Sequence, residues 1–165
     1  MASPPYLWNW LSLGSRAQKE ATQLLRLLHQ VLELHAQLRP DIFRSGTTKY
    51  TADELCTMLL DDTRPIYVAA EDGRILGYAF CILRSQPFSN NMVQFQSLFI
   101  DDLCVDQDAR GQGVGHKLFD YLRGEAKRLQ CYELTLNVWE GNDSARRFYE
   151  NLGMRPKETQ MELIL

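Results

Sequence analysis

Apolar residues recur with two different periods along this 165-residue chain, and the two periods predict helices and strands. Over residues 19–38 they recur at intervals of three and four, which is typical of an amphipathic helix. Thr51 and Glu54 have the spacing of a capping box and open a second, shorter helix. Residues 1–15 are expected to be flexible or to contribute a short edge strand at residues 6–13, where apolar side chains partly alternate.

The middle of the chain has the two-residue period of β-strands. Residues 66–70 and 75–83 predict two antiparallel strands joined by an Asp-Gly turn. Residues 98–105 predict a third strand. The polar stretch before it, residues 85–94, is either an active-site flap or a loose loop.

The last third of the chain alternates between the two periods. A helical pattern runs from residue 114 to residue 129, and strict alternation over residues 132–139 then predicts a half-buried strand. Asn142 or Asp143 can cap a short helix after it. Residues 161–165 predict a closing strand.

This order of elements predicts an α/β (α+β) fold with a mixed, mostly antiparallel sheet flanked by helices. A chain of 165 residues has room for one domain, so we expect residues 1–165 to form a single domain. Hydrophobic residues make up 45% and charged residues 24% of the chain, which is ordinary for a soluble globular protein.

Charge and cysteine usage exclude several classes of partner. A net charge of −3 and an isoelectric point near 5.6 speak against nucleic-acid binding. No apolar run is long enough to span a membrane, and the N-terminus lacks the basic region of a signal peptide, so we expect a cytoplasmic protein that binds no membrane. The four cysteines form no C-x-x-C pair, which favours core thiols in a reducing compartment and predicts no metal site.

A glycine-rich turn, residues 110–115 with the sequence RGQGVG, follows the strand at residues 98–105. Glycines let the backbone approach a ligand closely, and the N–H groups at a helix N-terminus favour phosphate. A Walker-type loop is excluded because no hydroxyl residue follows Lys117, and G-x-G-x-x-G fails because His116 and Leu118 stand where glycine is needed. A plain glycine turn that caps the helix is the alternative.

Two motifs together resemble those of the GNAT superfamily of N-acetyltransferases. Residues 110–115 satisfy its Arg/Gln-x-x-Gly-x-Gly/Ala pattern, and residues 142–154 match N-x-x-A-x-x-F-Y-x-x-x-G-F/M. The resemblance covers about residues 66–165, and the N-terminal helices match only in type. It implies acetyl-CoA as co-substrate, held in a V-shaped splay between the parallel strands at residues 98–105 and 132–139.

The resemblance also assigns residues to the cofactor and to catalysis. Strand backbone groups bind the pantetheine arm, and the glycine turn and its arginine bind the pyrophosphate. Asn137, on the second parallel strand, lies at the mouth of the V, and Asn142 and Ser144 line the thiol end of the cofactor. The residues assigned to the cofactor are Leu103, Cys104, Val105, Arg110, Gly111, Gln112, Gly113, Val114, Gly115, His116, Asn137, Asn142 and Ser144. Tyr149 matches the tyrosine that protonates the departing thiolate.

Acetyl transfer to an amine also needs a base, because a lysine-like amine with a pKa of about 10.4 is almost fully protonated at neutral pH. Asp101 and Asp102 interrupt an apolar strand, and such conflicts tend to mark functional sites, although an exposed sheet edge would also explain them. They are candidate bases, directly or through water. A strand N–H near Leu103 or Cys104 would stabilise the developing oxyanion. The acidic pair also resembles that of the polyamine and diamine acetyltransferases.

The sequence therefore predicts an acetyl-CoA-dependent N-acetyltransferase that moves the acetyl group directly to a primary amine of a small molecule. Acetylation of protein N-termini or lysines is an alternative of the same class. A non-catalytic acyl-CoA-binding or sensing domain, which would not use Tyr149, is an alternative of another class. The sequence is compatible with a homodimer, and the acceptor amine is left open.

Overall fold

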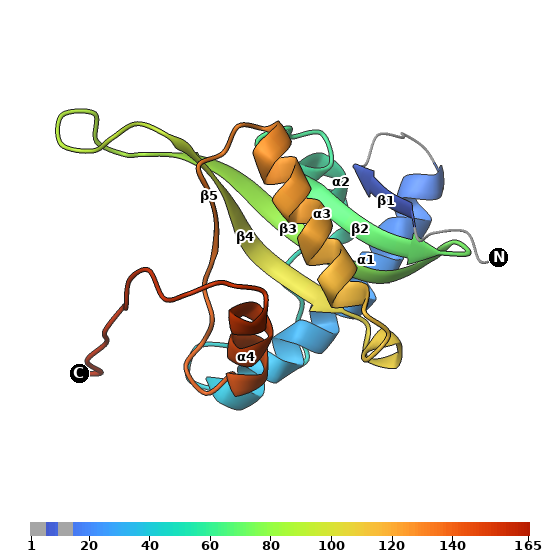
Figure 1. Cartoon of the computed structure of the whole chain (residues 1–165). Coiled ribbons are helices and arrows are strands. Elements are labelled where there is room, and N and C mark those ends of the chain that lie inside the picture. Colours follow the sequence, from blue (N-terminus) through green and yellow to red (C-terminus); the bar gives the residue numbers. More distant parts are fainter. Residues whose placement is uncertain (1–5, 10–14) are drawn as a thin grey trace.

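The fold is a sheet with helices on both faces. The structure, a computed structural model, describes residues 6–9 and 15–165. Its helices are α1 (Ser15–Leu38), α2 (Ala52–Met58), α3 (Val114–Arg128) and α4 (Asp143–Asn151), with a short 3₁₀ helix, η1 (Gln107–Ala109). Its strands are β1 (Tyr6–Asn9), β2 (Ile66–Glu71), β3 (Arg74–Ser85), β4 (Gln96–Val105) and β5 (Glu133–Leu136) (Figure 1).

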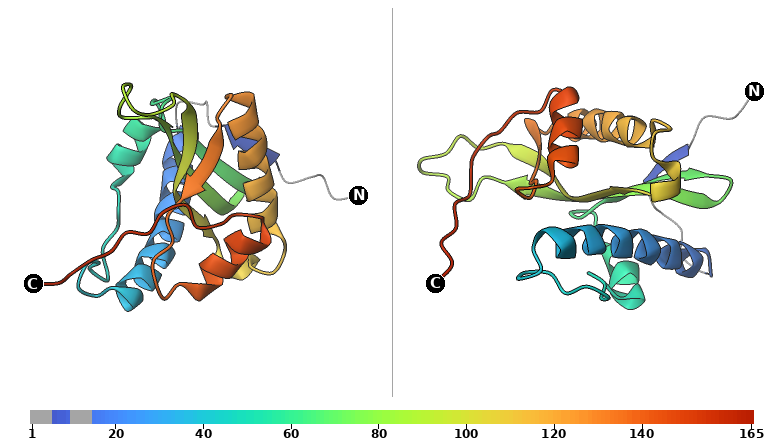
Figure 2. Two further views of the ribbon diagram at one scale, coloured as in Figure 1. Left: turned by 60° about the vertical axis from the view of Figure 1, so that its left-hand side comes forward. Right: turned by 90° about the horizontal axis from the view of Figure 1, so that it is seen from below.

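The five described strands lie side by side in the order in which they follow along the chain. Neighbours are antiparallel from β1 to β4, whereas β4 and β5 are parallel. Helices α1 and α2 cover one face of the sheet, and α3 and α4 lie on the other (Figure 2). The predicted mixed, mostly antiparallel sheet flanked by helices is confirmed. Of the first predicted strand, residues 6–9 form β1, and residues 10–13 lie outside the described part.

Each face of the sheet has its own apolar core. Leu24 and Leu28 of α1 belong to one buried cluster, together with Phe80 of β3. Leu118 of α3 and Leu98 of β4 belong to a second cluster on the opposite face. The three- and four-residue period of both helices therefore faces the sheet, as the sequence predicts.

Two local sequence patterns, the capping box and the Asp-Gly turn, form the structures that they predict. The Thr51 hydroxyl accepts a hydrogen bond from the Glu54 N–H at 3.2 Å, and the Glu54 carboxylate accepts one from the Thr51 N–H at 2.7 Å, which completes the capping box of α2. In the turn between β2 and β3, Asp72 and Gly73 have φ angles of 49° and 77°. These left-handed conformations match the twist of a two-residue hairpin.

The last parallel strand is shorter than the alternation over residues 132–139 predicts. Its pairing with β4 ends at the Ile100–Leu136 pair, while β4 continues to Val105. A strand is held by hydrogen bonds to its neighbours, so alternation beyond the last pair does not extend the strand.

The predicted closing strand over residues 161–165 is wrong. This segment has no regular structure and pairs with none of the described strands. Its apolar side chains are exposed. An alternating pattern produces a strand only where a partner edge is within reach, and this tail leaves the sheet after it crosses β5 (Figure 1).

Candidate active site

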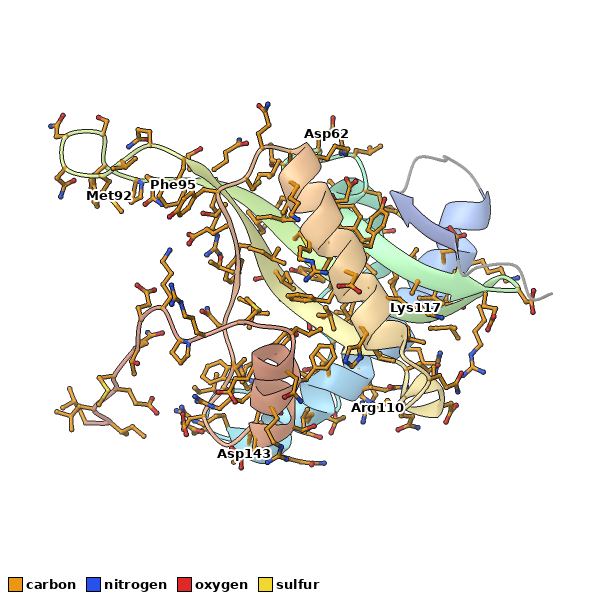
Figure 3. All side chains as sticks on the ribbon, viewed as in Figure 1. Asp62, Met92, Phe95, Arg110, Lys117 and Asp143 are labelled. Carbon is orange, nitrogen blue, oxygen red and sulfur yellow. The ribbon has the colours of Figure 1, made fainter. Side chains whose placement is uncertain are left out.

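The glycine turn connects the end of β4 to the start of α3. Gly111 and Gly113 have φ angles of 75° and 77°, which residues with a Cβ rarely adopt. Gly113 is the N-cap of α3, and no described side chain caps the helix there. The first N–H groups of α3 are therefore available to an anion, which the helix dipole also favours. Arg110 and Lys117 lie at the same end of the helix (Figure 3).

Two further glycines allow close packing around this turn. A Cβ on Gly115 would lie 3.2 Å from the Phe148 ring and 3.4 Å from a methyl group of Val105. A Cβ on Gly77 of β3 would lie 2.9 Å from the backbone oxygen of Cys104. Glycine at these positions lets α3, α4 and β3 approach the end of β4, and the sequence alone did not single out Gly77.

Asp106, directly after β4, is fully buried and fixes the turn to the rest of the fold. Its carboxylate pairs with Arg26 of α1 and, at 2.9 Å, with Arg74 of β3, and it accepts a 3.3 Å hydrogen bond from Gln30. The hydrogen bond from Arg26, helped by that from Arg74, outweighs burial and holds the pKa of Asp106 well below its usual range. Sequence reasoning missed this residue, although an acid at the end of a buried strand was a usable signal.

The side chains of the turn itself make few contacts. The exposed Arg110 donates through Nε to the Val105 oxygen at 3.4 Å. Gln112 donates to the Asp108 oxygen at 3.1 Å. His116 packs edge-on against a phenylalanine ring of α4, with ring centroids 5.3 Å apart. The guanidinium of Arg110 is thus accessible to a ligand beside the turn.

Three other residues assigned to the cofactor lie on the segment that joins β5 to α4. Asn142 is the N-cap of α4, and its side-chain oxygen accepts a hydrogen bond from the Ala145 N–H at 3.2 Å. Asn137 directly follows β5, and Ser144 lies in the first turn of α4, where both are exposed. Contact between these three side chains and a cofactor stays a prediction.

The acidic pair lies at an irregularity in the centre of the sheet. The β3–β4 ladder shifts by one residue between Phe80 and Cys81, which makes Asp101 the extra residue of a β-bulge. Lys49 donates a 2.7 Å hydrogen bond to Asp101, and its charge also acts on Asp102, so both carboxylates face Lys49. The pairing of β4 with β5 ends at Ile100, so both acids lie just beyond the part of β4 that β5 covers, and the alternative that they mark a sheet edge stays open.

Burial raises the pKa of Asp102 to about 6. The charge of Lys49 and a 3.2 Å hydrogen bond from the Tyr78 hydroxyl lower this pKa, while the neighbouring Asp101 raises it. A carboxyl group with a pKa near neutrality can take up and release a proton at physiological pH. Asp102 therefore has the protonation behaviour that a general base requires.

Tyr149 of α4 lies within electrostatic reach of Asp102. Burial raises the pKa of Tyr149 well above its usual value, and the negative charge of Asp102 adds to the rise. The hydroxyl is consequently protonated at neutral pH, and it makes no hydrogen bond to another described residue. A base and a protonated donor thus lie near each other at the end of β4.

The thiol of Cys104 packs as part of the core. Its sulfur donates a weak hydrogen bond to the Leu27 oxygen at 3.6 Å, and burial raises the pKa of the thiol to about 12. A thiol that stays protonated is a poor nucleophile. The structure therefore offers no activated cysteine at this position.

Lys49 and Tyr78 complete the acidic site, and sequence reasoning did not find either residue. Lys49 ends a polar loop before α2 and lies 52 positions from Asp101 in the chain. Its ammonium group also lies 5.3 Å from the centre of the Tyr50 ring. Tyr78 occupies a regular buried position of β3. Neither position carries a pattern that distinguishes it from an ordinary loop lysine or core tyrosine.

Aromatic side chains gather beside the acidic site. The His35 ring lies 5.1 Å from that of Phe43, which lies 5.3 Å from that of Trp139. Burial lowers the pKa of His35, and the charge of Lys49 lowers it further. The end of α1, the loop after it and the segment after β5 therefore meet next to the two carboxylates.

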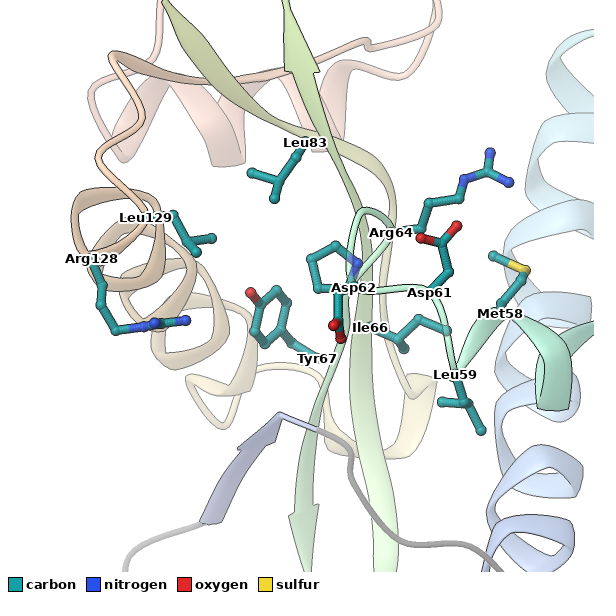
Figure 4. Close-up of a pocket in the computed structure, with 11 residues that line it drawn as sticks. Met58, Leu59, Asp61, Asp62, Arg64, Ile66, Tyr67, Leu83, Arg128 and Leu129 are labelled. Atoms are coloured by element: carbon teal, nitrogen blue, oxygen red, sulfur yellow. The ribbon is translucent and has the colours of Figure 1, made fainter.

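A separate pocket lies away from these groups. Tyr67, Leu83 and Arg128 contribute to its lining, together with residues that follow α2 (Figure 4). It contains none of the residues that the sequence assigns to the cofactor or to catalysis. The candidate site therefore depends on the glycine turn and the acidic pair, and not on this pocket.

Metal binding and membrane crossing were also considered for the described residues. No group of three or more His, Cys, Asp or Glu in residues 6–9 and 15–165 could hold a metal ion. Within the same part of the chain, no helix combines the length and the apolar character that a membrane crossing requires. A reaction without a metal stays a prediction.

The family of the chain follows from comparison with known proteins. Residues 28–154 match the model of the Acetyltransferase (GNAT) family, and the chain belongs to this family. The resemblance carried by the glycine turn and by residues 142–154 is thereby confirmed at the level of the family.

Individual relatives agree with this assignment. A mutant of the BH1408 protein from Bacillus halodurans has the same fold, with a TM-score of 0.87 and 29% identity over 97% of this chain and 99% of that chain. The 5-NmdU N-acetyltransferase of Pseudomonas phage PaMx11 is 33% identical over 88 residues, which are 53% of this chain and 55% of that protein. Glucosamine 6-phosphate N-acetyltransferase of Arabidopsis thaliana is 36% identical over 62 residues, which are 38% and 40% of the two chains. The chain thus spans about half the length, or less, of these curated relatives.

Proposed function

We propose that this protein is an acetyl-CoA-dependent N-acetyltransferase that transfers the acetyl group directly to a primary amine of a small molecule. The observation that carries the proposal is the glycine turn, which leaves the N-terminus of α3 uncapped directly after the strand that carries Asp102. Asp102 has a pKa of about 6 and Tyr149 remains protonated, so the two groups suit opposite proton transfers.

The residues around the turn suit a CoA pyrophosphate. Gly111 and Gly113 adopt conformations that favour glycine, and a Cβ on Gly115 would crowd its neighbours. The uncapped N–H groups of α3 and the accessible Arg110 would hold the phosphate oxygens. When bound, acetyl-CoA supplies the activated acetyl group.

We infer that the pantetheine arm lies in a V-shaped opening between β4 and β5. The strands stop pairing after Ile100, so the backbone of Leu103, Cys104 and Val105 has no β5 residue beside it. Asp102 shares a sheet face with Phe80, which packs against α1, whereas Tyr149 belongs to the helix on the other face.

In the proposed reaction, Asp102 accepts a proton from the acceptor ammonium, directly or through water, and so produces the free amine. Asp101, held by Lys49, stays close and keeps the local charge favourable for a cationic acceptor. A backbone N–H of Cys104 or Leu103 would donate to the carbonyl oxygen as negative charge develops on it. The free amine would then attack the acetyl carbonyl carbon, and the C–S bond would break. Tyr149 would donate its proton to the leaving thiolate, and the second proton of the attacking nitrogen would pass to the Tyr149 oxygen or to water.

A small amine is supported by the acidic pair and by the relatives. The names of the relatives from phage PaMx11 and Arabidopsis thaliana place an acetyl group on a modified nucleotide base and on an amino sugar phosphate. The ion pair between Lys49 and Asp101 leaves Asp102 as the carboxylate without a cationic hydrogen-bond partner. This arrangement would bind one ammonium group. Polyamines, which the resemblance of the acidic pair suggests, are one kind of small amine that it would accept.

The proposal is tested by measuring free thiol released from acetyl-CoA with a panel of amino sugars, diamines, amino acids and peptides. We expect release with small amines and little with peptides. Release with peptides alone would favour a protein acetyltransferase, and CoA binding without release from any acceptor would favour a sensing domain. Gly113→Val should abolish CoA binding in calorimetry, and wild-type affinity in that variant would contradict the role of the turn.

A further inference from the structure

Lys49 brings a primary amine of the chain itself to the acidic pair. Its ammonium group donates a 2.7 Å hydrogen bond to Asp101, and its charge acts on Asp102, the proposed base. A small-molecule acceptor would have to bring its own ammonium group to the same two carboxylates. Lys49 therefore already makes the contacts that the proposed reaction requires of an acceptor amine.

The residue that follows Lys49 anchors it above the acidic pair. The Tyr50 ring stacks on that of Phe80, with centroids 5.6 Å apart, and Phe80 is the residue of β3 that pairs with Asp102. The Lys49 side chain is 39% exposed, and its four-carbon stem is flexible. The backbone at this point is thus held against the sheet, while the amine is free to move from Asp101 to a group beside it.

Lys49 needs the same proton transfer as any other acceptor. Burial lowers the pKa of Lys49, but the hydrogen bond to Asp101 and the charges of Asp102 and Asp101 outweigh burial, and the pKa is raised. The amine is consequently an ammonium ion at neutral pH, and it is no nucleophile until a base removes a proton. Acetylation of Lys49 by the active site would therefore depend on Asp102.

The other lysines of the chain lie elsewhere and serve as internal controls. Lys19 lies on α1 and Lys117 and Lys127 lie on α3, and all three side chains are exposed. Lys157, also exposed, pairs with Glu133 at 2.6 Å. Among the described residues, Lys49 is the lysine that contacts the acidic pair.

We propose that Lys49 is a modification site, acetylated by the active site of its own chain. The inference rests on the proposed N-acetyltransferase function and adds an acceptor that belongs to the protein. Acetylation would remove the positive charge of Lys49 and with it the ion pair to Asp101. Both carboxylates would then be without this cation.

The chemical step is the one proposed for a small amine. Asp102 takes a proton from the Lys49 ammonium, the freed nitrogen forms a bond to the acetyl carbonyl carbon, and the C–S bond breaks. The sulfur leaves as a thiolate and receives a proton from Tyr149, and the second proton of the attacking nitrogen passes to the Tyr149 oxygen or to water. The products are N-acetyl-lysine at position 49 and CoA with a free thiol.

The first test incubates the whole chain with acetyl-CoA that carries an isotopically labelled acetyl group and locates the label by peptide mass spectrometry. We expect the label on Lys49 at a rate that exceeds those at Lys117 and Lys127 and that does not depend on protein concentration. An unlabelled acetyl group already on Lys49 of the purified wild-type protein, but absent from purified Asp102→Asn protein, is the same result. A rate no higher than at the exposed lysines, or one that rises in proportion to protein concentration, would overturn the proposal.

Variants separate an enzymatic reaction from chemical acetylation. Asp102→Asn should slow acetylation of Lys49 by about 10²-fold or more and leave the rates at the other lysines unchanged. Tyr149→Phe, which keeps the aromatic ring, is a second variant that should also slow it. Lys49→Arg keeps the positive charge and should gain no label at position 49. Wild-type rates at Lys49 in both Asp102→Asn and Tyr149→Phe would contradict acetylation by the active site.

A parallel assay distinguishes this inference from the proposed function. The same protein is tested for thiol release from acetyl-CoA with the panel of small amines. Thiol release with an amine, but no label on Lys49, would overturn the modification site and leave the proposed function in place. Absence of both thiol release and label would contradict the two proposals together.

Discussion

Two carboxylates four positions apart in the chain, Asp102 and Asp106, differ in what surrounds them. Asp106 is fully buried but accepts hydrogen bonds from Arg26 and Arg74, and its pKa lies well below the usual range. Asp102 accepts a side-chain hydrogen bond from the Tyr78 hydroxyl. Lys49, which is hydrogen-bonded to Asp101, acts on Asp102 only through its charge, and the pKa of Asp102 rises to about 6. The charge of a buried acid therefore depends on the balance between burial, which is the largest influence on Asp102, and hydrogen-bond donors, which are the largest influence on Asp106.

The difference distinguishes an acid suited to a structural role, Asp106, from an acid suited to proton transfer, Asp102. An acid such as Asp106, which is ionised at every physiological pH, can hold α1 and β3 together beside the glycine turn, but it cannot exchange protons. An acid that titrates near neutrality can exchange protons, but its charged form is held less well by the fold. Four substitutions test this comparison, and their expected effects are given from the largest to the smallest.

Asp102→Asn should lower turnover about 10³-fold because the amide cannot accept the amine proton. CoA affinity should not change, since Asp102 lies outside the glycine turn. Thiol release under saturating acetyl-CoA measures turnover, and calorimetry measures CoA binding. Turnover close to that of the wild-type protein would indicate that Asp101 or water, and not Asp102, acts as the base.

Asp106→Asn should lower the free energy of unfolding by about 2–3 kcal/mol at pH 7, because it removes the carboxylate that pairs with Arg26 and leaves Arg74 with only the exposed Asp108. The folded pKa of Asp106 is lowered, so this stability is present above the unfolded pKa of about 3.9 and is lost as the pH falls below it. Urea unfolding should therefore show that the two proteins converge in acid. The control Asp108→Asn removes an exposed acid that pairs with Arg74 at 3.3 Å, and it should cost less than about 1 kcal/mol.

Tyr149→Phe should lower turnover about 10²-fold while leaving CoA affinity nearly unchanged. The substitution keeps the ring that packs beside Phe119 and Phe148 and removes only the hydroxyl. Turnover and CoA binding are measured as for Asp102→Asn. Unchanged turnover would mean that the thiolate leaves without help from this proton.

Lys49→Met should shift the pH profile of kcat/KM to higher pH by up to about one unit. The wild-type profile should rise with pH around the Asp102 pKa of about 6, because the base acts when ionised. Lys49 lowers this pKa, so its removal raises the pKa of Asp102, and Tyr78 and Asp101 remain as the other side chains that act on Asp102. Lys49→Arg keeps the charge and should leave the profile in place, and an unshifted profile in Lys49→Met would contradict the electrostatic coupling.

The cofactor side of the site could be predicted from the sequence because its signals are local. The turn at residues 110–115 has glycines whose spacing is fixed by backbone conformation, and two of them indeed have positive φ. The helix after it, the Asp-Gly hairpin and the capping box depend on neighbours within a few residues, and all of them form as predicted. The conflict between Asp101, Asp102 and an apolar strand also identified the acids that lie in the central strand.

The remaining parts depend on contacts between distant residues. Lys49 reaches Asp101 and Arg26 reaches Asp106 across 52 and 80 positions, and no local pattern indicates either contact. The closing strand over residues 161–165 was predicted from alternation alone, which does not show whether a partner edge is near.

The β-bulge at Asp101 shows how a strand can gain a functional group by insertion. In a regular ladder adjacent side chains point to opposite faces, so two consecutive acids could not both face Lys49. Removal of Asp101 would place Ile100 and Asp102 opposite Cys81 and Phe80 in regular register. One inserted residue can therefore provide the second carboxylate while Asp102 and the end of the strand keep their register with β3.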